Sequence, residues 1–131
     1  SIAAGIGVAG GLTAVRFRSS LRDPRDVVFV FAALAAGIAA GVQAGIDAIR
    51  PGVTGAAVFE AAVSAARKAG LASFDRHHVG HGIGLETSEL PMLAPGGGAL
   101  EAGMVLRVEA PYYVPGETGC FNCQQLAYRR S

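Results

Sequence analysis

The pattern of apolar and polar positions predicts strands at the start of the chain, followed by a long helix. Apolar residues interspersed with glycines across residues 2–19 are typical of short strands broken by turns or bulges. The helix begins at Asp23-Pro24, because the carboxylate can cap a helix and proline suits its first turn. We expect this helix to continue to about Ile49, where Pro51-Gly52 ends it.

A second helix and a second group of strands follow. Thr54 is placed to cap a helix that runs to Ala69, and Gly70 marks its end. The pattern then predicts a glycine-bearing strand and loop over residues 77–89, a loop over 91–98, and strands over 104–113 and 121–128. Strands, two helices and further strands in this order indicate an α+β fold.

Composition narrows the class of protein. Hydrophobic residues make up 51% of the chain and charged residues only 16%, so we expect part of its surface to be covered by a partner or by a missing part of the same protein. A net charge of +1 gives no sign of nucleic-acid binding or of an anionic membrane surface. The two cysteines are too few for a secreted disulfide scaffold, and the first residues lack a charged signal-peptide region. A cytoplasmic, enzyme-like domain is the expectation.

The apolar segment 27–46 has two interpretations. It is about long enough to span a bilayer, and it carries glycines at positions 37, 41 and 45, a spacing that allows helices to approach closely. The alternative is a buried helix packed on a sheet. We favour the buried helix and expect no membrane association, because alanine and glycine contribute little to membrane insertion.

Three segments together resemble the pita-bread-fold superfamily, which includes creatinase, prolidase, Xaa-Pro aminopeptidase and methionine aminopeptidase. They are the turn IRPGVT at 49–54, the strand GHGIGLE at 80–86, and LEAGMVLRVE at 100–109 followed by PYY at 111–113. The resemblance implies a curved, mostly antiparallel sheet with two long helices packed on it. Residues 1–131 would form a single partial pita-bread domain, whose N-terminal portion has been cut off, lost, or encoded on another chain.

The resemblance also implies a catalytic centre of two divalent metal ions, held by two aspartates, a histidine and two glutamates. His81 stands at the histidine position, Glu109 at the first glutamate, and Gln124 at the second. The aspartates would fall within residues 6–19, yet no Asp or Glu precedes Asp23. Two dications beside so little negative charge would repel strongly in a low-dielectric cleft. We therefore predict no dimetal centre, no metal ligands and no cofactor.

Other side chains near these motifs complete the candidate site. His77 matches the histidine that contacts substrate in prolidase-like members, and Ser88 falls where the family has a further histidine. The candidate catalytic residues are His81, His77 and Glu109, and the candidate substrate-binding residues are His78, Gln124, Ser88 and Tyr112.

The chemistry of several of these residues has a plainer alternative. The imidazole of His81 could be a general base, or it could be a hydrogen-bonded relic in a polar cleft. Glu109 could hold a cationic or amide-bearing substrate group or orient His81, or it could be a structural carboxylate paired with an arginine.

Cys120 and Cys123 lack the second pair that a zinc site needs, so we interpret them as ordinary cysteines. Arg16, Arg18, Arg22 and Arg25 could bind an anion, but a solvated or interface surface is favoured.

Three functions remain. The favoured one is a metal-independent hydrolase acting on a small amide or amidino C–N substrate with a histidine base, as the resemblance to creatinase suggests. The second is a non-catalytic descendant that binds a peptide or small molecule or stabilises a partner subunit. The third is a metallopeptidase completed by another chain. For each, we expect a homodimer or a pairing with a separate N-terminal half.

Overall fold

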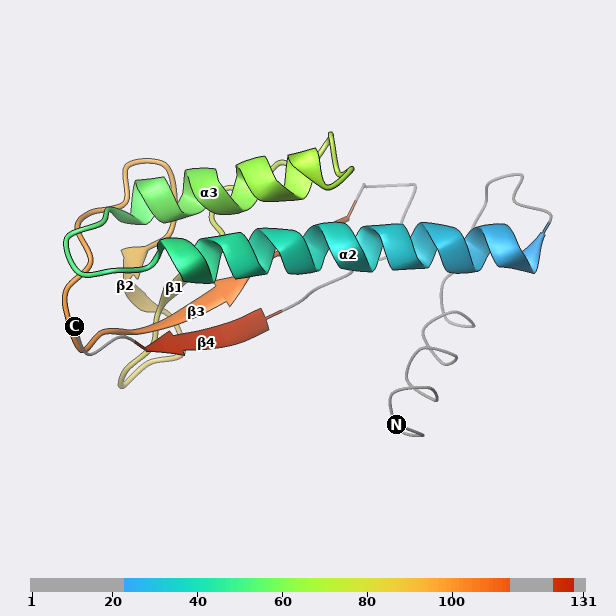
Figure 1. The fold of residues 1–131 in the computed structure, drawn as a ribbon. Helices are drawn as coiled ribbons and strands as arrows, with labels where there is room; N and C mark the ends of the chain where they lie inside the picture. The colour runs from blue at the N-terminus through green and yellow to red at the C-terminus, as the bar shows by residue number, and fades with distance from the viewer. Residues whose placement is uncertain (1–22, 114–123, 129–131) are drawn as a thin grey trace.

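A computed structural model of the chain describes residues 23–113 and 124–128. The predicted order of two helices followed by strands is confirmed over this part (Figure 1), whereas the strands expected within residues 2–19 lie outside it. The helices are α2 (Pro24–Ala48) and α3 (Gly55–Lys68), and the strands are β1 (Gly80–Gly82), β2 (Glu89–Met92), β3 (Val105–Glu109) and β4 (Gln124–Tyr128).

The predicted helix ends are confirmed by their capping contacts. A carboxylate oxygen of Asp23 accepts a hydrogen bond of 2.9 Å from the backbone N–H of Arg25, and Pro24 occupies the first turn of α2. The hydroxyl of Thr54 accepts a bond of 3.1 Å from the N–H of Ala57 at the start of α3. Gly70 follows α3 with a φ of +110°, a conformation in which glycine avoids the strain of a side chain.

The small residues of α2 let the two helices pack closely. A methyl group added to Gly41 would lie 3.1 Å from Cβ of Ala66 and 3.2 Å from the carbonyl oxygen of Ala62, so a side chain there would force α3 to shift slightly away. Gly37 and Gly45 are buried on the same face of α2. By length and composition alone α2 could cross a membrane, and only 22% of that apolar window is buried. The buried-helix interpretation therefore describes only the glycine face of α2, which packs against α3.

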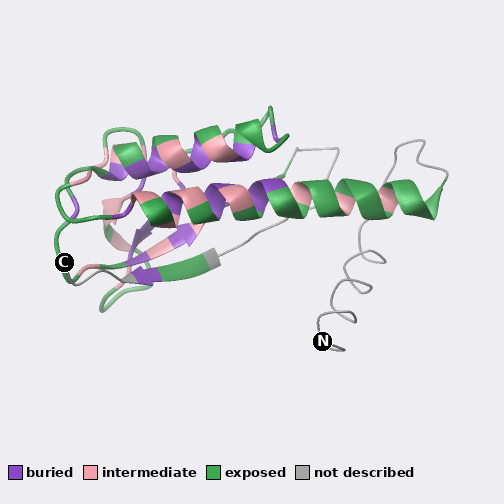
Figure 2. Ribbon diagram, viewed as in Figure 1, coloured by how far each residue is buried: buried purple, intermediate pink, exposed green. Residues whose placement is uncertain are grey.

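The first half of α2 extends beyond this packing. Figure 2 shows the buried positions of α2 gathered in its second half, where α3 and the sheet lie beside it. In the first half, Val28 is 53% exposed and Phe29 is 72% exposed. Most of the apolar surface at this end of the helix therefore faces away from the described core.

The four strands form one antiparallel sheet in the order β2-β1-β3-β4, and both helices lie over the same face of it (Figure 1). The core lies between helices and sheet, where Val58, Phe74, Leu106 and Val108 are almost fully buried. Because side chains alternate along a strand, Arg107 and Glu109 of β3 project from the opposite face. The helices thus leave that face free to carry a site.

One loop prediction needs correction, and two predicted strands are shorter in the structure. The loop predicted over residues 91–98 is wrong at its start, because Pro91 and Met92 belong to β2. This strand lies at the edge of the sheet, where proline is tolerated because it need not donate to a neighbour. The strand predicted within 77–89 is limited to β1, and the one predicted over 104–113 to β3. Residues 121–123 of the last predicted strand lie outside the described residues.

Candidate functional site

His81 lies at the centre of the open face and is fixed by its own strand. It is 7% exposed, and Nδ1 lies 2.9 Å from the carbonyl oxygen of Gly82. Because a carbonyl oxygen can only accept, Nδ1 must carry the proton of this hydrogen bond. In the neutral imidazole Nε2 is then left as an acceptor. In that form of the ring the fold presents Nε2 as a hydrogen-bond acceptor in a largely buried position.

The glycine that precedes His81 permits the close pairing of β1 with β3. Gly80 has a φ of +153°, and a Cβ atom at this position would collide with the carbonyl oxygen of Arg107. A side chain at this position would force the two strands apart. Gly80 thus allows β1, which carries the imidazole of His81, to pair closely with β3.

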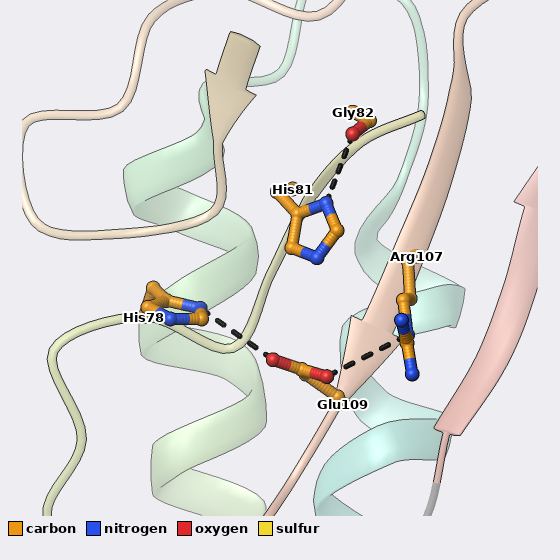
Figure 3. Close-up of polar contacts among 5 residues, drawn as sticks. All are labelled: His78, His81, Gly82, Arg107 and Glu109. Carbon is orange, nitrogen blue, oxygen red and sulfur yellow. Dashed lines mark hydrogen bonds and ion pairs between the residues drawn. The ribbon is translucent and has the colours of Figure 1, made fainter. Parts of the chain in front are cut away.

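Glu109 and Arg107 form an ion pair on the same face of β3. Arg107 Nε lies 3.6 Å from Glu109 Oε2, and the side chains are 34% and 15% exposed respectively. The register of the sheet places Arg107 directly opposite His81 of β1. An imidazole, a guanidinium and a carboxylate consequently share one small region (Figure 3).

His78 completes this cluster from the segment before β1. Its Nδ1 atom lies 3.9 Å from Glu109 Oε1, which is too long for a hydrogen bond, and this nitrogen is buried without a hydrogen-bond partner among the described residues. The rings of His78 and His81 have centroids 6.4 Å apart and are inclined at 65°. Figure 3 shows Glu109 between His78 and Arg107, with His81 beside them.

Within the described part of the chain, three of the other predicted site residues, His77, Ser88 and Tyr112, do not join the cluster. His77 is exposed, and so is Ser88, which precedes β2. Tyr112 is engaged elsewhere, with its hydroxyl 3.1 Å from the hydroxyl of Ser73 and its ring stacked on Phe74 at 6.3 Å. Gln124 is paired with Glu109 in the register of β3 and β4, but its side chain lies outside the described atoms. Contact of these four residues with a substrate stays a prediction.

Arg107 is the residue that the sequence analysis missed as a site residue. The plainer interpretation of Glu109 foresaw an arginine partner without naming it. Strand alternation carried the missing signal, because residues 107 and 109 are two apart in a segment predicted to be a strand. The ion pair between Glu109 and Arg107 is the carboxylate–arginine pairing that the plainer interpretation of Glu109 described.

The described residues do not fit the dimetal centre that the resemblance implies. Among them, no group of three or more histidine, cysteine, aspartate or glutamate side chains could hold a metal ion. Nε2 of His81 has the right chemistry for a ligand, but Glu109 is already paired with a guanidinium. A catalytic zinc site uses three protein ligands, and a second dication would need still more negative charge.

Comparison with known proteins places the chain in a family. Residues 27–127 match metallopeptidase family M24. The probable dipeptidase PepE of Mycobacterium tuberculosis is 43% identical over 74 residues, and the Xaa-Pro dipeptidase of Lactobacillus delbrueckii subsp. lactis is 40% identical over 74 residues. Each match covers 56% of this chain and 20% of the relative, so the aligned part corresponds to about a fifth of the length of these curated relatives.

Solved structures agree with the sequence relatives. The dipeptidase PepE from Mycobacterium ulcerans superposes with a TM-score of 0.61 at 35% identity, covering 82% of this chain and 28% of that one. The N-terminal domain of the FACT complex subunit SPT16 from chickpea gives a TM-score of 0.68 at 19% identity, covering 82% and 27%, and shares the fold alone. The predicted pita-bread fold is thereby confirmed, in a form that spans part of its relatives. The chain belongs to metallopeptidase family M24 and is related to its dipeptidase and Xaa-Pro dipeptidase members.

Proposed function

We propose that this chain is a hydrolase of the M24 family that cleaves a small C–N substrate with His81 as general base and without a dimetal centre. The observation that supports this most directly is the hydrogen bond from Nδ1 of His81 to the carbonyl oxygen of Gly82. It fixes the ring and leaves Nε2 as the proton acceptor. A positioned imidazole of this kind contributes roughly 10²–10⁴-fold to a hydrolytic rate.

In the proposed reaction, Nε2 of His81 takes a proton from a water molecule while the water oxygen attacks the carbon of the C–N bond. The imidazolium then returns that proton to the departing nitrogen. Glu109 accepts a hydrogen bond from the N–H group of the substrate and so positions it. Because Arg107 already offsets the charge of Glu109, the pair favours a neutral amide over a cationic amidino group.

The test uses the full-length protein and a panel of dipeptides and small amides, with release of the amine as the readout. In His81→Asn, the shorter amide can still donate to Gly82 but offers no base. We expect kcat/KM to fall by about 10²–10⁴-fold while the melting temperature stays within a few degrees. Activity that survives this substitution would show that His81 is not the base.

Metal dependence is tested separately. We expect less than one equivalent of divalent metal in the purified protein, and activity that persists after treatment with EDTA. Activity that is lost on chelation and recovered with a stoichiometric divalent metal would instead establish the third interpretation, a metallopeptidase whose carboxylates come from another chain.

A second candidate is a binding subunit without turnover. The observation that favours it is the placement of the remaining candidates, since His77 and Ser88 are exposed and the hydroxyl of Tyr112 is bound to Ser73. On this proposal no member of the substrate panel is hydrolysed, and His81→Asn leaves the affinity for a bound peptide unchanged.

A further inference from the structure

A small cavity lies beside the His81 cluster. It is lined by Ile83, Arg107, Gln125 and Leu126 and has a volume of about 260 Å³. The register of β3 places Arg107 opposite Leu126 of β4 on one side and opposite His81 of β1 on the other. Residues opposite each other in a sheet project from the same face. The cavity therefore shares Arg107 with the His81 cluster, on the face that the helices leave free.

The lining of this cavity combines one cation with aliphatic surface. Arg107 contacts Glu109 through its Nε atom at 3.6 Å, which is too long for a hydrogen bond, so this pair does not take up the N–H groups of the two terminal nitrogens. A guanidinium presents its remaining N–H groups in a planar fork that matches the two oxygens of a carboxylate. Ile83 and Leu126 add apolar surface, and Leu126 is 70% exposed. Apolar surface next to the fork lowers the local dielectric constant and strengthens a charged contact.

Charge and apolar lining, more than size, decide what this open cavity can take. A volume of about 260 Å³ lies just below the roughly 300–1,000 Å³ typical of pockets for drug-sized ligands. A phosphate group would bring more negative charge close to Glu109 and would gain nothing from the aliphatic side chains. A single carboxylate on a compact aliphatic group satisfies both the fork and the apolar lining.

We propose that Arg107 and this cavity form a subsite for a carboxylate that carries a small aliphatic group. The subsite rests on the proposed function in one respect, because it would anchor the carboxylate end of the substrate whose C–N bond faces His81. Binding of the carboxylate itself requires no turnover. The pair Arg107–Glu109 then has two roles, since one end of the guanidinium steadies Glu109 and the other end receives the ligand.

The experiment titrates the ¹⁵N-labelled full-length protein with 3-methylbutanoate and follows the backbone amide signals by NMR. We expect saturable shifts at Ile83 and Leu126. The uncharged 3-methylbutanamide should bind at least tenfold more weakly, which corresponds to about 1.4 kcal/mol. Arg107→Met should bind the carboxylate at least tenfold more weakly than the wild type, whereas Arg50→Met, at the exposed turn between the helices, should bind it normally.

Three results would overturn the proposal: equal affinity for the acid and the amide, undiminished binding by Arg107→Met, or tighter binding of inorganic phosphate than of the carboxylate. The comparison of acid with amide uses the wild type alone, so it decides the matter even where Arg107→Met fails to fold. Carboxylate binding without hydrolysis of any panel substrate would refute the proposed function and leave the subsite standing. Hydrolysis that is indifferent to a substrate carboxylate and to Arg107→Met would refute the subsite alone.

Discussion

The Nε atom of Arg107 lies 3.6 Å from Oε2 of Glu109. Both side chains lie on the same face of the sheet as His81, which is paired with Arg107 in the neighbouring strand β1. Glu109 is 15% exposed, so removing its partner would leave a mostly buried carboxylate poorly compensated. We expect Arg107→Met and Glu109→Gln to be non-additive in a double-mutant cycle, with a coupling free energy of about 0.5–2 kcal/mol from urea unfolding.

The chain offers a matched control for this cycle in Arg25 and Asp23. Their charged groups are 3.9 Å apart, but the side chains are 86% and 52% exposed. Solvent screens such a pair, so Arg25→Met and Asp23→Asn should be additive within about 0.5 kcal/mol. Equal coupling in both cycles would contradict the view that burial distinguishes the pair in the site.

The glycine before His81 gives a second prediction. Gly80→Ala introduces a Cβ atom into the carbonyl oxygen of Arg107 at a φ that side chains rarely adopt. We expect it to lower the free energy of unfolding by about 2–4 kcal/mol. Gly98→Ala is the control, because an added Cβ there meets nothing within 4 Å. Thermal or urea unfolding of both variants measures the difference, and equal stabilities would show that β1 can move away from β3 at little cost.

The contact of the two helices gives a third prediction. Gly41→Leu places a side chain against Ala62 and Ala66 of α3, and we expect a loss of about 1–3 kcal/mol despite the better helix propensity of leucine. Ala39→Leu makes a comparable change at an exposed position of the same helix and should be near neutral. A stable Gly41→Leu variant would mean that α3 is free to shift.

The cap of α3 gives a fourth prediction. Thr54→Ala removes the hydroxyl that accepts from the N–H of Ala57, and we expect a loss of about 1 kcal/mol in the free energy of unfolding. Ser64→Ala deletes a hydroxyl from an exposed position within the same helix and should be neutral or slightly stabilising. If the two variants proved equally stable, the hydrogen bond seen at Thr54 would contribute nothing measurable.

The helices were predictable because capping residues close in sequence determine where they begin and end. The caps at Asp23 and Thr54 and the glycine at position 70 act within a few residues, so they can be recognised without knowledge of the rest of the fold. The strand β2 was missed because Pro91 normally argues against a strand. Only the order of the sheet, which places β2 at an edge, explains why proline is accepted there.

The candidate site was predictable where a strand carries it and less so elsewhere. His81 and Glu109 lie on β1 and β3, and the structure brings them to the same face of the sheet. His77 and His78 precede β1 in irregular chain, where alternation gives no direction, and it is His78 that approaches Glu109. The cavity beside Arg107 could not be foreseen, because it depends on the register between strands about twenty residues apart in the sequence.

The uneven burial of α2 along its length has a consequence for local unfolding of the helix. Its second half is held by α3 and the sheet, while its first half, with Phe29 largely in solvent, gains little from packing. Backbone amides near Gly45 should therefore exchange with deuterated solvent only when the whole domain unfolds, and those near Val28 should exchange through fraying of the outer turns. One unbroken helix is thus expected to contain two levels of protection, with the transition near Gly37.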